Sequence, residues 1–193
     1  MGKRDEELII EVQSGSAAAM EELFQRYKRS IFNYALKILS NRADAEDVVS
    51  EVFIILFSRQ YSYSPTAKFS TWLYTVAHNV SISRIRKRRR WLSVWFKKED
   101  GEDFSAWEIP DTRTLPAEDL EQKETAWYVK KAIAKLPSQQ REVLVLREYQ
   151  GLSYEEIARV LNISLAQVKI LIFRGRERLR EELRSFMKEA NDV

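Results

Sequence analysis

The chain has 193 residues and contains 32 Lys and Arg against 29 Asp and Glu, so its formal net charge of +3 says little about its partners. It contains no cysteine, which excludes disulfide bonds, thiolate catalysis and cysteine-ligated zinc. The first ten residues lack the apolar core of a signal peptide, and the longest apolar run, VVSEVFIILF, is about half a membrane span and contains Glu51. We therefore expect a cytoplasmic protein with no direct membrane insertion.

Helical periodicity runs through the first part of the chain. Apolar residues recur at spacings of three and four through residues 8–39, which is typical of helices that face a core. The segment SNRAD interrupts this pattern, and a further helix is predicted from about Ala43 to Phe57. After a loop at SYSPTAKFS, Ser70 is predicted to cap the next helix, with Phe69 and Tyr74 as a hydrophobic staple.

The helix predicted near residues 43–57 has an apolar face and a separate acidic side. At 100° per residue, Asp44, Asp47, Glu51 and Ile54 share that second side. Acids in a first turn also complement the helix N-terminus, which is the simpler interpretation. Ile54 beside Glu51, however, forms an apolar and anionic patch that suits a basic protein partner.

The stretch WLYTVAHNVSISRIRKRRRW, residues 72–91, combines a buried stripe with a polar stripe that contains Asn79, and it ends in five consecutive cations. Aromatic rings, an amide and cations are the groups that bind single-stranded nucleic acid. The alternative is that Trp72 and Tyr74 belong to the core and the cations are a solvated helix end. The sequence leaves these two interpretations equally supported, and His78 is interpreted as an ordinary helix residue.

Charge is unevenly distributed around the middle of the chain. Residues 52–98 contain ten basic residues and no acid, whereas residues 99–124 contain ten acids against Arg113 and Lys123. The acidic part includes Gly101, Pro110 and Pro116 and has no helical period, so it is predicted to be a linker. Helices are predicted to resume at about residues 120–136, 138–149, 153–161 and 165–188.

Two capping signatures lie eleven residues apart in the last part of the chain. Ser153 with Glu156, and Ser164 with Gln167, each place a hydroxyl before a helix and a Glu or Gln at its third position. Asn162 lies in the turn between the two helices and tolerates the left-handed conformation. With the surrounding arginines, this spacing predicts a DNA-binding helix-turn-helix rather than a plain helical hairpin.

Four segments together resemble bacterial RNA polymerase sigma factors of the extracytoplasmic-function type. They are DAEDVVSEVF, FSTWLYTVAHN, LPSQQREVLVLREYQGLSYEEIARVL and VKILIFRGRERL, and they occur in the family's order and at its spacing. The resemblance implies an all-α fold of two small helical domains joined by a flexible acidic linker. Residues 1–92 would bind core polymerase and the minus-ten element, residues 93–120 would be the linker, and residues 121–193 would read the minus-thirty-five element.

The resemblance also implies site residues and partners. Contacts to core RNA polymerase would come from Asp44, Asp47, Ser50, Glu51 and Ile54. Minus-ten DNA would be contacted by Trp72, Asn79, Ser83, Arg86, Lys87 and Arg88, and minus-thirty-five DNA by Ser164, Leu165, Gln167, Lys169, Ile170, Arg174 and Arg176. An anti-sigma protein is implied as a further partner, and no cofactor, metal, small-molecule substrate or catalytic site is expected.

Several positions depart from the family's pattern. Ser50 replaces a frequent Gln, Ser83 replaces a frequent Asp, and Thr75 stands where a basic residue is common. Leu165 and Ile170 make the expected reading face of the last helix unusually apolar, which suits contacts to thymine methyl groups. The promoter sequence therefore does not follow from the residues.

Two other functions are compatible with parts of the chain. A stand-alone helix-turn-helix regulator accounts for residues 138–188 but gives no role to Asp47, Glu51 or Asn79. A metal-dependent phosphotransfer enzyme would use the acids near residues 44–51, yet the chain has no phosphate-binding glycine loop. The linker is interpreted either as a tether or as a segment that occupies a basic channel of the polymerase.

Overall fold

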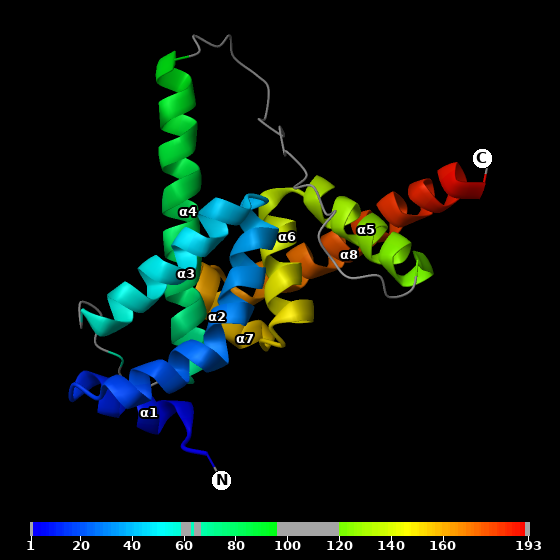
Figure 1. Ribbon diagram of the computed structural model, residues 1–193. Coiled ribbons are helices and arrows are strands. Elements are labelled where there is room, and N and C mark those ends of the chain that lie inside the picture. Colours follow the sequence, from blue (N-terminus) through cyan, green and yellow to red (C-terminus); the bar gives the residue numbers. More distant parts are fainter. Residues whose placement is uncertain (1, 59–62, 64–66, 96–119, 192–193) are drawn as a thin grey trace.

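The computed structural model describes residues 2–58, 63, 67–95 and 120–191, and none of these residues lies in a strand (Figure 1). In chain order the helices are α1 (Asp5–Gln13), α2 (Ala17–Leu39), α3 (Arg42–Phe57), α4 (Phe69–Trp95), α5 (Leu120–Lys135), α6 (Ser138–Leu144), the π-helical turn η1 (Val145–Tyr149), α7 (Tyr154–Leu161) and α8 (Leu165–Asn191). The predicted all-α class is confirmed. The linker predicted at residues 93–120 lies outside the described residues, except that α4 continues to Trp95 and α5 begins at Leu120.

Helices α1 to α4 form the amino-terminal lobe, which comprises the described residues up to 95. Two of the helices begin at local caps, because Ser16 Oγ accepts from Ala19 N (3.2 Å) and Asn41 Oδ1 accepts from Asp44 N (2.9 Å). The apolar stripes predicted from the periodicity face one another. Their fully buried members are Leu23, Ile31, Tyr34, Ala35, Ala45, Val48, Val52, Leu73 and Ala77.

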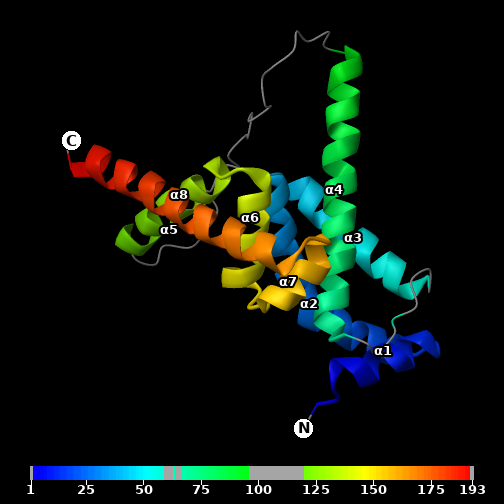
Figure 2. The same ribbon diagram turned by 180° about the vertical axis from the view of Figure 1, so that it is seen from behind.

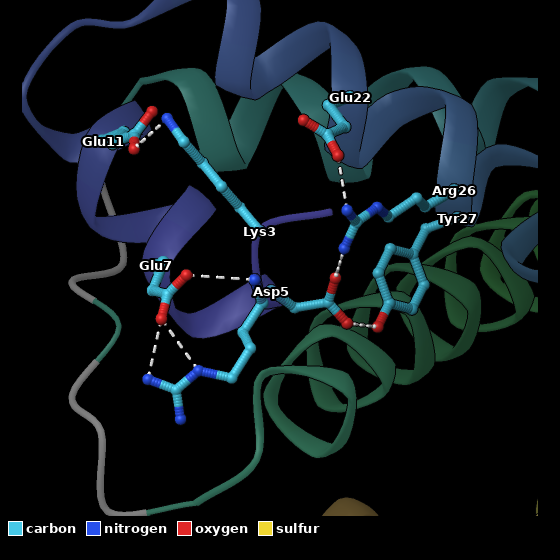
Figure 3. Close-up of polar contacts among 8 residues, drawn as sticks. Lys3, Asp5, Glu7, Glu11, Glu22, Arg26 and Tyr27 are labelled. Carbon is cyan, nitrogen blue, oxygen red and sulfur yellow. Dashed lines mark hydrogen bonds and ion pairs between the residues drawn. The ribbon is translucent and has the colours of Figure 1, made fainter. Parts of the chain in front are cut away.

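Polar contacts between side chains connect α1 to α2 (Figure 3). Asp5 accepts from Arg26 Nη1 at 2.6 Å and from the hydroxyl of Tyr27, and Arg26 also pairs with Glu22. Asp5 and Arg26 are both partly shielded from solvent, so this pair orders its side chains more than a fully exposed pair would. Burial, followed by the hydrogen bond to Asp5, raises the pKa of Tyr27 well above its ordinary value.

The start of α4 differs from the prediction. The helix begins at Phe69, so Ser70 lies inside it and is not its cap. The amide of Phe69 donates to Glu6 Oε1 of α1 (3.2 Å), and Trp72 N donates to Lys68 O (3.3 Å). A carboxylate at a helix N-terminus satisfies a free amide and complements the helix dipole. Because Glu6 is 63 residues away, a local pattern did not reveal it.

Helices α5 to α8 form the carboxy-terminal lobe, which comprises residues 120–191. Buried Arg141 terminates α5, since its guanidinium donates to the carbonyls of Ile133 (3.1 Å), Ala134 (2.6 Å) and Leu136 (2.7 Å). A cation at these carbonyls caps the end of the helix and complements its dipole. Burial lowers the pKa of Arg141 to about 10, against the attraction of Glu142.

The helix-turn-helix has the predicted local structure. Ser153 and Glu156 form the reciprocal capping box, and Ser164 Oγ accepts from Gln167 N (3.2 Å) while Gln167 Oε1 accepts from Ser164 N (2.9 Å). Asn162 is left-handed, with φ 52° and ψ 48°. Gly151 is left-handed, with φ +68°, and ends the preceding turn η1, while the amide of Leu152 donates to Leu146 O (3.1 Å).

The two lobes are packed against each other, which the sequence did not indicate. Helix α7 lies along α4 (Figure 2), and buried side chains of both lobes form one continuous apolar cluster. Lys68 Nζ lies 3.0 Å from Glu156 Oε1, and the hydroxyl of Tyr74 donates to Gln150 Oε1. A hollow of about 500 Å³ near these contacts is lined by residues of both lobes, including Glu6, Arg159 and Tyr63.

Candidate protein and nucleic-acid interfaces

The acidic face, defined as Asp44, Asp47, Glu51 and Ile54 of α3, is organised by a cation from α4. Arg84 Nη1 donates to Asp47 Oδ2 (2.9 Å), and Nη2 donates to Glu51 Oε2 (3.0 Å). The same Nη1 lies 3.8 Å from Asp44 Oδ1. The structure therefore brings the three predicted carboxylates together around one guanidinium, a position that no local pattern of residues predicts.

Apolar side chains extend the acidic face. Ile54 is 65% exposed, and Phe57, which the sequence interpretation did not include, is 68% exposed at the end of the same helix. Ser50 is also exposed and donates its hydroxyl to Glu46 O (3.2 Å). Large exposed apolar groups beside anions are typical of a protein-binding surface.

The polar face of α4, defined as Asn79, Ser83, Arg86, Lys87 and Arg88, is exposed along its whole length. The carboxy-terminal part of α4 projects away from the other helices (Figures 1 and 2). The predicted buried stripe, Leu73, Val76, Ala77 and Val80, is buried in the core. A projecting cationic helix offers its charge to a polyanion without competition from the protein core.

The aromatic residues of α4 are mostly part of the core. Tyr74 is buried, and Trp72 is half-buried with its ring edge-on to Tyr63 at 5.9 Å and tilted against Phe69 at 5.8 Å. His78 Nδ1 lies 3.2 Å from the hydroxyl of Tyr34 on α2. Burial, and secondarily Arg86, lowers the pKa of His78 to about 4, so the neutral ring is a structural residue at neutral pH.

The reading face of α8 contains the predicted residues Leu165, Gln167, Lys169, Ile170 and Arg174, all of which are exposed. Val168 and Ile172 turn inward and are buried in the core. Phe173, which is 68% exposed, was missed by the sequence interpretation, although its position three residues after Ile170 was the available signal. An exposed Phe, Ile and Leu beside cations offer apolar contacts to thymine methyl groups.

Three predicted residues of this lobe already have partners. Ser164 and Gln167 cap α8 reciprocally, yet both stay exposed. Arg176 donates to Glu148 Oε1 through Nη2 (2.7 Å) and Nε (3.2 Å), and these hydrogen bonds raise its pKa. The remaining cations, Lys169 and Arg174, lie on the first turns of α8.

Within the described residues there is no helix with the length and apolarity that crossing a membrane requires. Those residues also contain no group of three or more His, Asp or Glu side chains arranged to hold a metal ion. Among the acids of α3 that the alternative phosphotransfer hypothesis uses, Asp47 and Glu51 are hydrogen-bonded to Arg84, and Glu46 is paired with Arg42.

Comparison with protein families identifies both lobes. Residues 23–90 match the family described as Sigma-70 region 2, and residues 127–179 match Sigma-70, region 4. The chain is 35% identical over 178 residues to the ECF RNA polymerase sigma factor SigW of Bacillus subtilis (strain 168), covering 91% of this chain and 95% of that one. It is 30% identical over 189 residues to the RNA polymerase sigma-H factor of Pseudomonas aeruginosa, covering 97% and 98%.

Solved structures share the arrangement of the chain. The sigma factor RpoE of Bartonella quintana, in complex with the anti-sigma factor NepR, superposes with a TM-score of 0.65 and 25% identity, over 85% of this chain and 96% of that one. CnrH, in complex with the cytosolic domain of CnrY, superposes with a TM-score of 0.68 over 95% of this chain and 99% of that one. At 23% identity the second likeness shows the fold alone.

Proposed function

Since this chain belongs to the extracytoplasmic-function (ECF) sigma factors of the sigma-70 superfamily, which initiate transcription through promoter recognition, we propose how its surfaces divide that task. Residues 1–92 bind core RNA polymerase and the minus-ten element. Residues 121–193 bind the minus-thirty-five element, and residues 93–120 join the two.

The acidic face of α3 is the proposed contact with core polymerase. Asp47 and Glu51 are 64% and 44% exposed in their side chains and keep carboxylate oxygens free for a basic partner. Ile54 and Phe57 add apolar area at the same end of the helix. A small apolar centre surrounded by charge gives affinity from burial and specificity from electrostatics.

The polar face of α4 is the proposed site for unpaired minus-ten DNA. Asn79 supplies hydrogen-bonding groups for a base edge, and Arg86, Lys87 and Arg88 supply phosphate partners. Trp72 presents only part of its ring, because Tyr63 and Phe69 cover the rest. We assign Trp72 to supporting the start of α4, with any contact to an unpaired base confined to the exposed part of its ring.

The reading face of α8 is the proposed minus-thirty-five contact. The first turns of a recognition helix enter the major groove, and here they carry Leu165, Lys169 and Ile170. Phe173 joins them, whereas Arg176 reaches DNA only if it leaves Glu148.

The packing of the lobes bears on how a promoter is bound. Promoter elements two and a half helical turns apart are separated by roughly 85 Å. Helices α4 and α7 are in direct contact, with Lys68 and Glu156 only 3.0 Å apart. The lobes therefore separate when both elements are bound, and polymerase is the partner that holds them apart.

The observation that carries this proposal is that the exposed acidic face of α3 and the exposed polar face of α4 are joined through Arg84 within one region-2 lobe. Run-off transcription with purified core polymerase tests it. Transcripts from specific starts should depend on the added chain, and the chain alone should bind the same duplex poorly. Transcription that is independent of the chain contradicts the proposal, and tight specific binding without polymerase favours the stand-alone regulator.

We further propose that the chain acts in the cytoplasm, has no catalytic site of its own and is held inactive by an anti-sigma protein. The last proposal is supported by the likeness to RpoE, whose structure was solved with the anti-sigma factor NepR. Affinity capture of the tagged chain from cells tests it. Recovery of a stoichiometric protein other than the core subunits supports such an inhibitor, and recovery of core subunits alone, under every growth condition, contradicts it.

A further inference from the structure

Arg84 occupies an unusual position between the two proposed interfaces of the amino-terminal lobe. It follows Ser83 on α4, yet its side chain turns back to α3 and is 26% exposed. Its Nη1 and Nη2 contact Asp47 and Glu51 at 2.9 and 3.0 Å, while its buried Nε has no partner among the described residues. A guanidinium placed in this way binds two carboxylates through a rigid fork.

The acids would not hold this arrangement by themselves. Asp44, Asp47 and Glu51 lie at spacings of three and four on one helix, where like charges repel each other. With Arg84 the group has a formal charge of −2 instead of −3, and two of its side chains are held by hydrogen bonds of 2.9 and 3.0 Å. The cation therefore lowers the total charge of the acidic face but orders it.

We propose that Arg84 is a positioning residue for polymerase binding, because it holds the Asp47 and Glu51 carboxylates ready for a basic surface of the core enzyme. This inference rests on the proposed contact between the acidic face and polymerase. Arg84 itself need not touch polymerase or DNA. Its ion pairs also connect the helix that binds polymerase to the helix that carries Asn79 and Ser83.

Two effects of removing Arg84 oppose each other. The extra negative charge would strengthen attraction to a basic partner, but charges at the surface are screened beyond about 8 Å at physiological salt. Loss of order has the opposite effect, since each side chain that must be immobilised on binding lowers affinity by roughly twofold to tenfold. With at least two carboxylates released, the loss of order is the larger effect.

The test is the equilibrium affinity of the labelled full-length chain for purified core polymerase. Arg84→Ala should weaken binding by about threefold to tenfold and make the affinity fall more steeply with added salt, because the acidic face gains net negative charge. Arg84→Lys keeps the charge but not the fork, so it should restore less than half of the loss. An Arg84→Ala variant that binds as tightly as the unmodified chain, or more tightly, overturns the inference.

Arg42→Ala is the matched control. Arg42 lies on α3 and pairs with Glu46 of that helix at 2.9 Å. Its substitution therefore removes one positive charge, as Arg84→Ala does, but leaves the acidic face unchanged. It should leave polymerase affinity unchanged. If Arg84→Ala does not fold, the test uses Arg84→Lys alone. An Arg84→Lys variant that binds polymerase as tightly as the unmodified chain then overturns the inference.

A double-mutant cycle separates positioning from general stability. Asp47→Asn should weaken binding by itself, and adding Arg84→Ala should then cost less than it does in the unmodified chain. Independent effects contradict positioning and leave a structural role only. If the unmodified chain does not bind polymerase, the proposed function fails, whereas binding that responds to Asp47→Asn but not to Arg84→Ala refutes only the role of Arg84.

Discussion

Lys68 Nζ lies 3.0 Å from Glu156 Oε1, although Lys68 belongs to the region-2 match and Glu156 to the region-4 match. The hydroxyl of Tyr74 and Gln150 Oε1 join the same two lobes nearby. Glu156 has a second task, since it accepts from Ser153 N (2.7 Å) in the capping box of α7. Glu156 therefore takes part both in the contact between the lobes and in the cap of α7, the first helix of the helix-turn-helix.

Substitutions at Lys68 should open the free chain. Lys68 is 73% exposed, so its pair with Glu156 contributes at most about 1 kcal/mol. Lys68→Glu replaces the attraction by repulsion, and it should increase the radius of gyration measured by small-angle X-ray scattering. Lys68→Ala should increase it less, and Lys68→Arg should leave it unchanged. An order other than this contradicts a role for the pair in closure.

Asn79→Ala should impair promoter opening rather than polymerase binding. Asn79 is exposed on α4 and away from the acidic face, so core affinity should stay within twofold of that of the unmodified chain. Loss of one base contact should reduce the fraction of open promoter by about tenfold, as measured by permanganate reactivity of unpaired thymines. Equal reactivity for the variant and the unmodified chain would assign the minus-ten contact elsewhere.

Phe173→Ala should weaken promoter recognition at the minus-thirty-five element. Phe173 is 68% exposed, so truncation should leave the folded lobe intact while removing apolar contact with the major groove. We expect holoenzyme affinity to fall about threefold to tenfold on a full promoter and not at all on a template without that element. Ile10→Ala is the control, since Ile10 is another exposed apolar residue, 53% exposed, on α1. The same loss on both templates would rule out a specific contact.

The stability of the chain should depend on pH through Glu142. Burial raises the pKa of this carboxyl from 4.5 to about 7, against the attraction of Arg141. The folded chain therefore prefers the protonated acid, so the stabilising effect of Glu142 is full below pH 4.5, falls as the pH rises to 7, and is constant above. Glu142→Gln mimics the protonated form and should raise the free energy of unfolding at pH 8 by about 1–3 kcal/mol.

Urea denaturation at pH 8 and pH 5 measures this difference. The advantage of Glu142→Gln should shrink at pH 5, where the native carboxyl is largely protonated. His78 has the opposite dependence, because its pKa is lowered to about 4 and folding loses stability as the pH falls from 6.5 to 4. Comparing two chains that both contain His78 removes its effect. An advantage that is independent of pH would contradict the assignment to Glu142.

Local signals predicted most of the helices and the helix-turn-helix. The caps at Ser153 and Ser164 and the left-handed Asn162 were predicted because each depends on residues within four positions. The end of the helix predicted at residues 138–149 was less regular than expected, since α6 gives way to the π-helical turn η1 at Val145. The hydrogen bonds of a π-helical turn leave no simple pattern in the residues.

Features that depend on distant residues were not predictable. The cap of α4 is Glu6 and not the predicted Ser70. Glu6 accepts from the amide of Phe69, which lies 63 positions later in the chain. Arg84 belongs to the basic segment of the chain, yet its side chain is hydrogen-bonded to Glu51 and Asp47, which lie 33 and 37 positions earlier. The contact between the lobes likewise joins side chains whose charges and hydroxyls are compatible with exposure to solvent.

The distance between the lobes during initiation tests the central claim most directly. The chain contains no cysteine, so cysteines introduced at the exposed positions Asn33 of α2 and Glu181 of α8 can carry a pair of fluorescent dyes. Energy transfer should be high in the free chain and fall sharply when core polymerase and promoter DNA are added, because the promoter elements are roughly 85 Å apart. Unchanged energy transfer in a complex that makes transcripts would contradict the account.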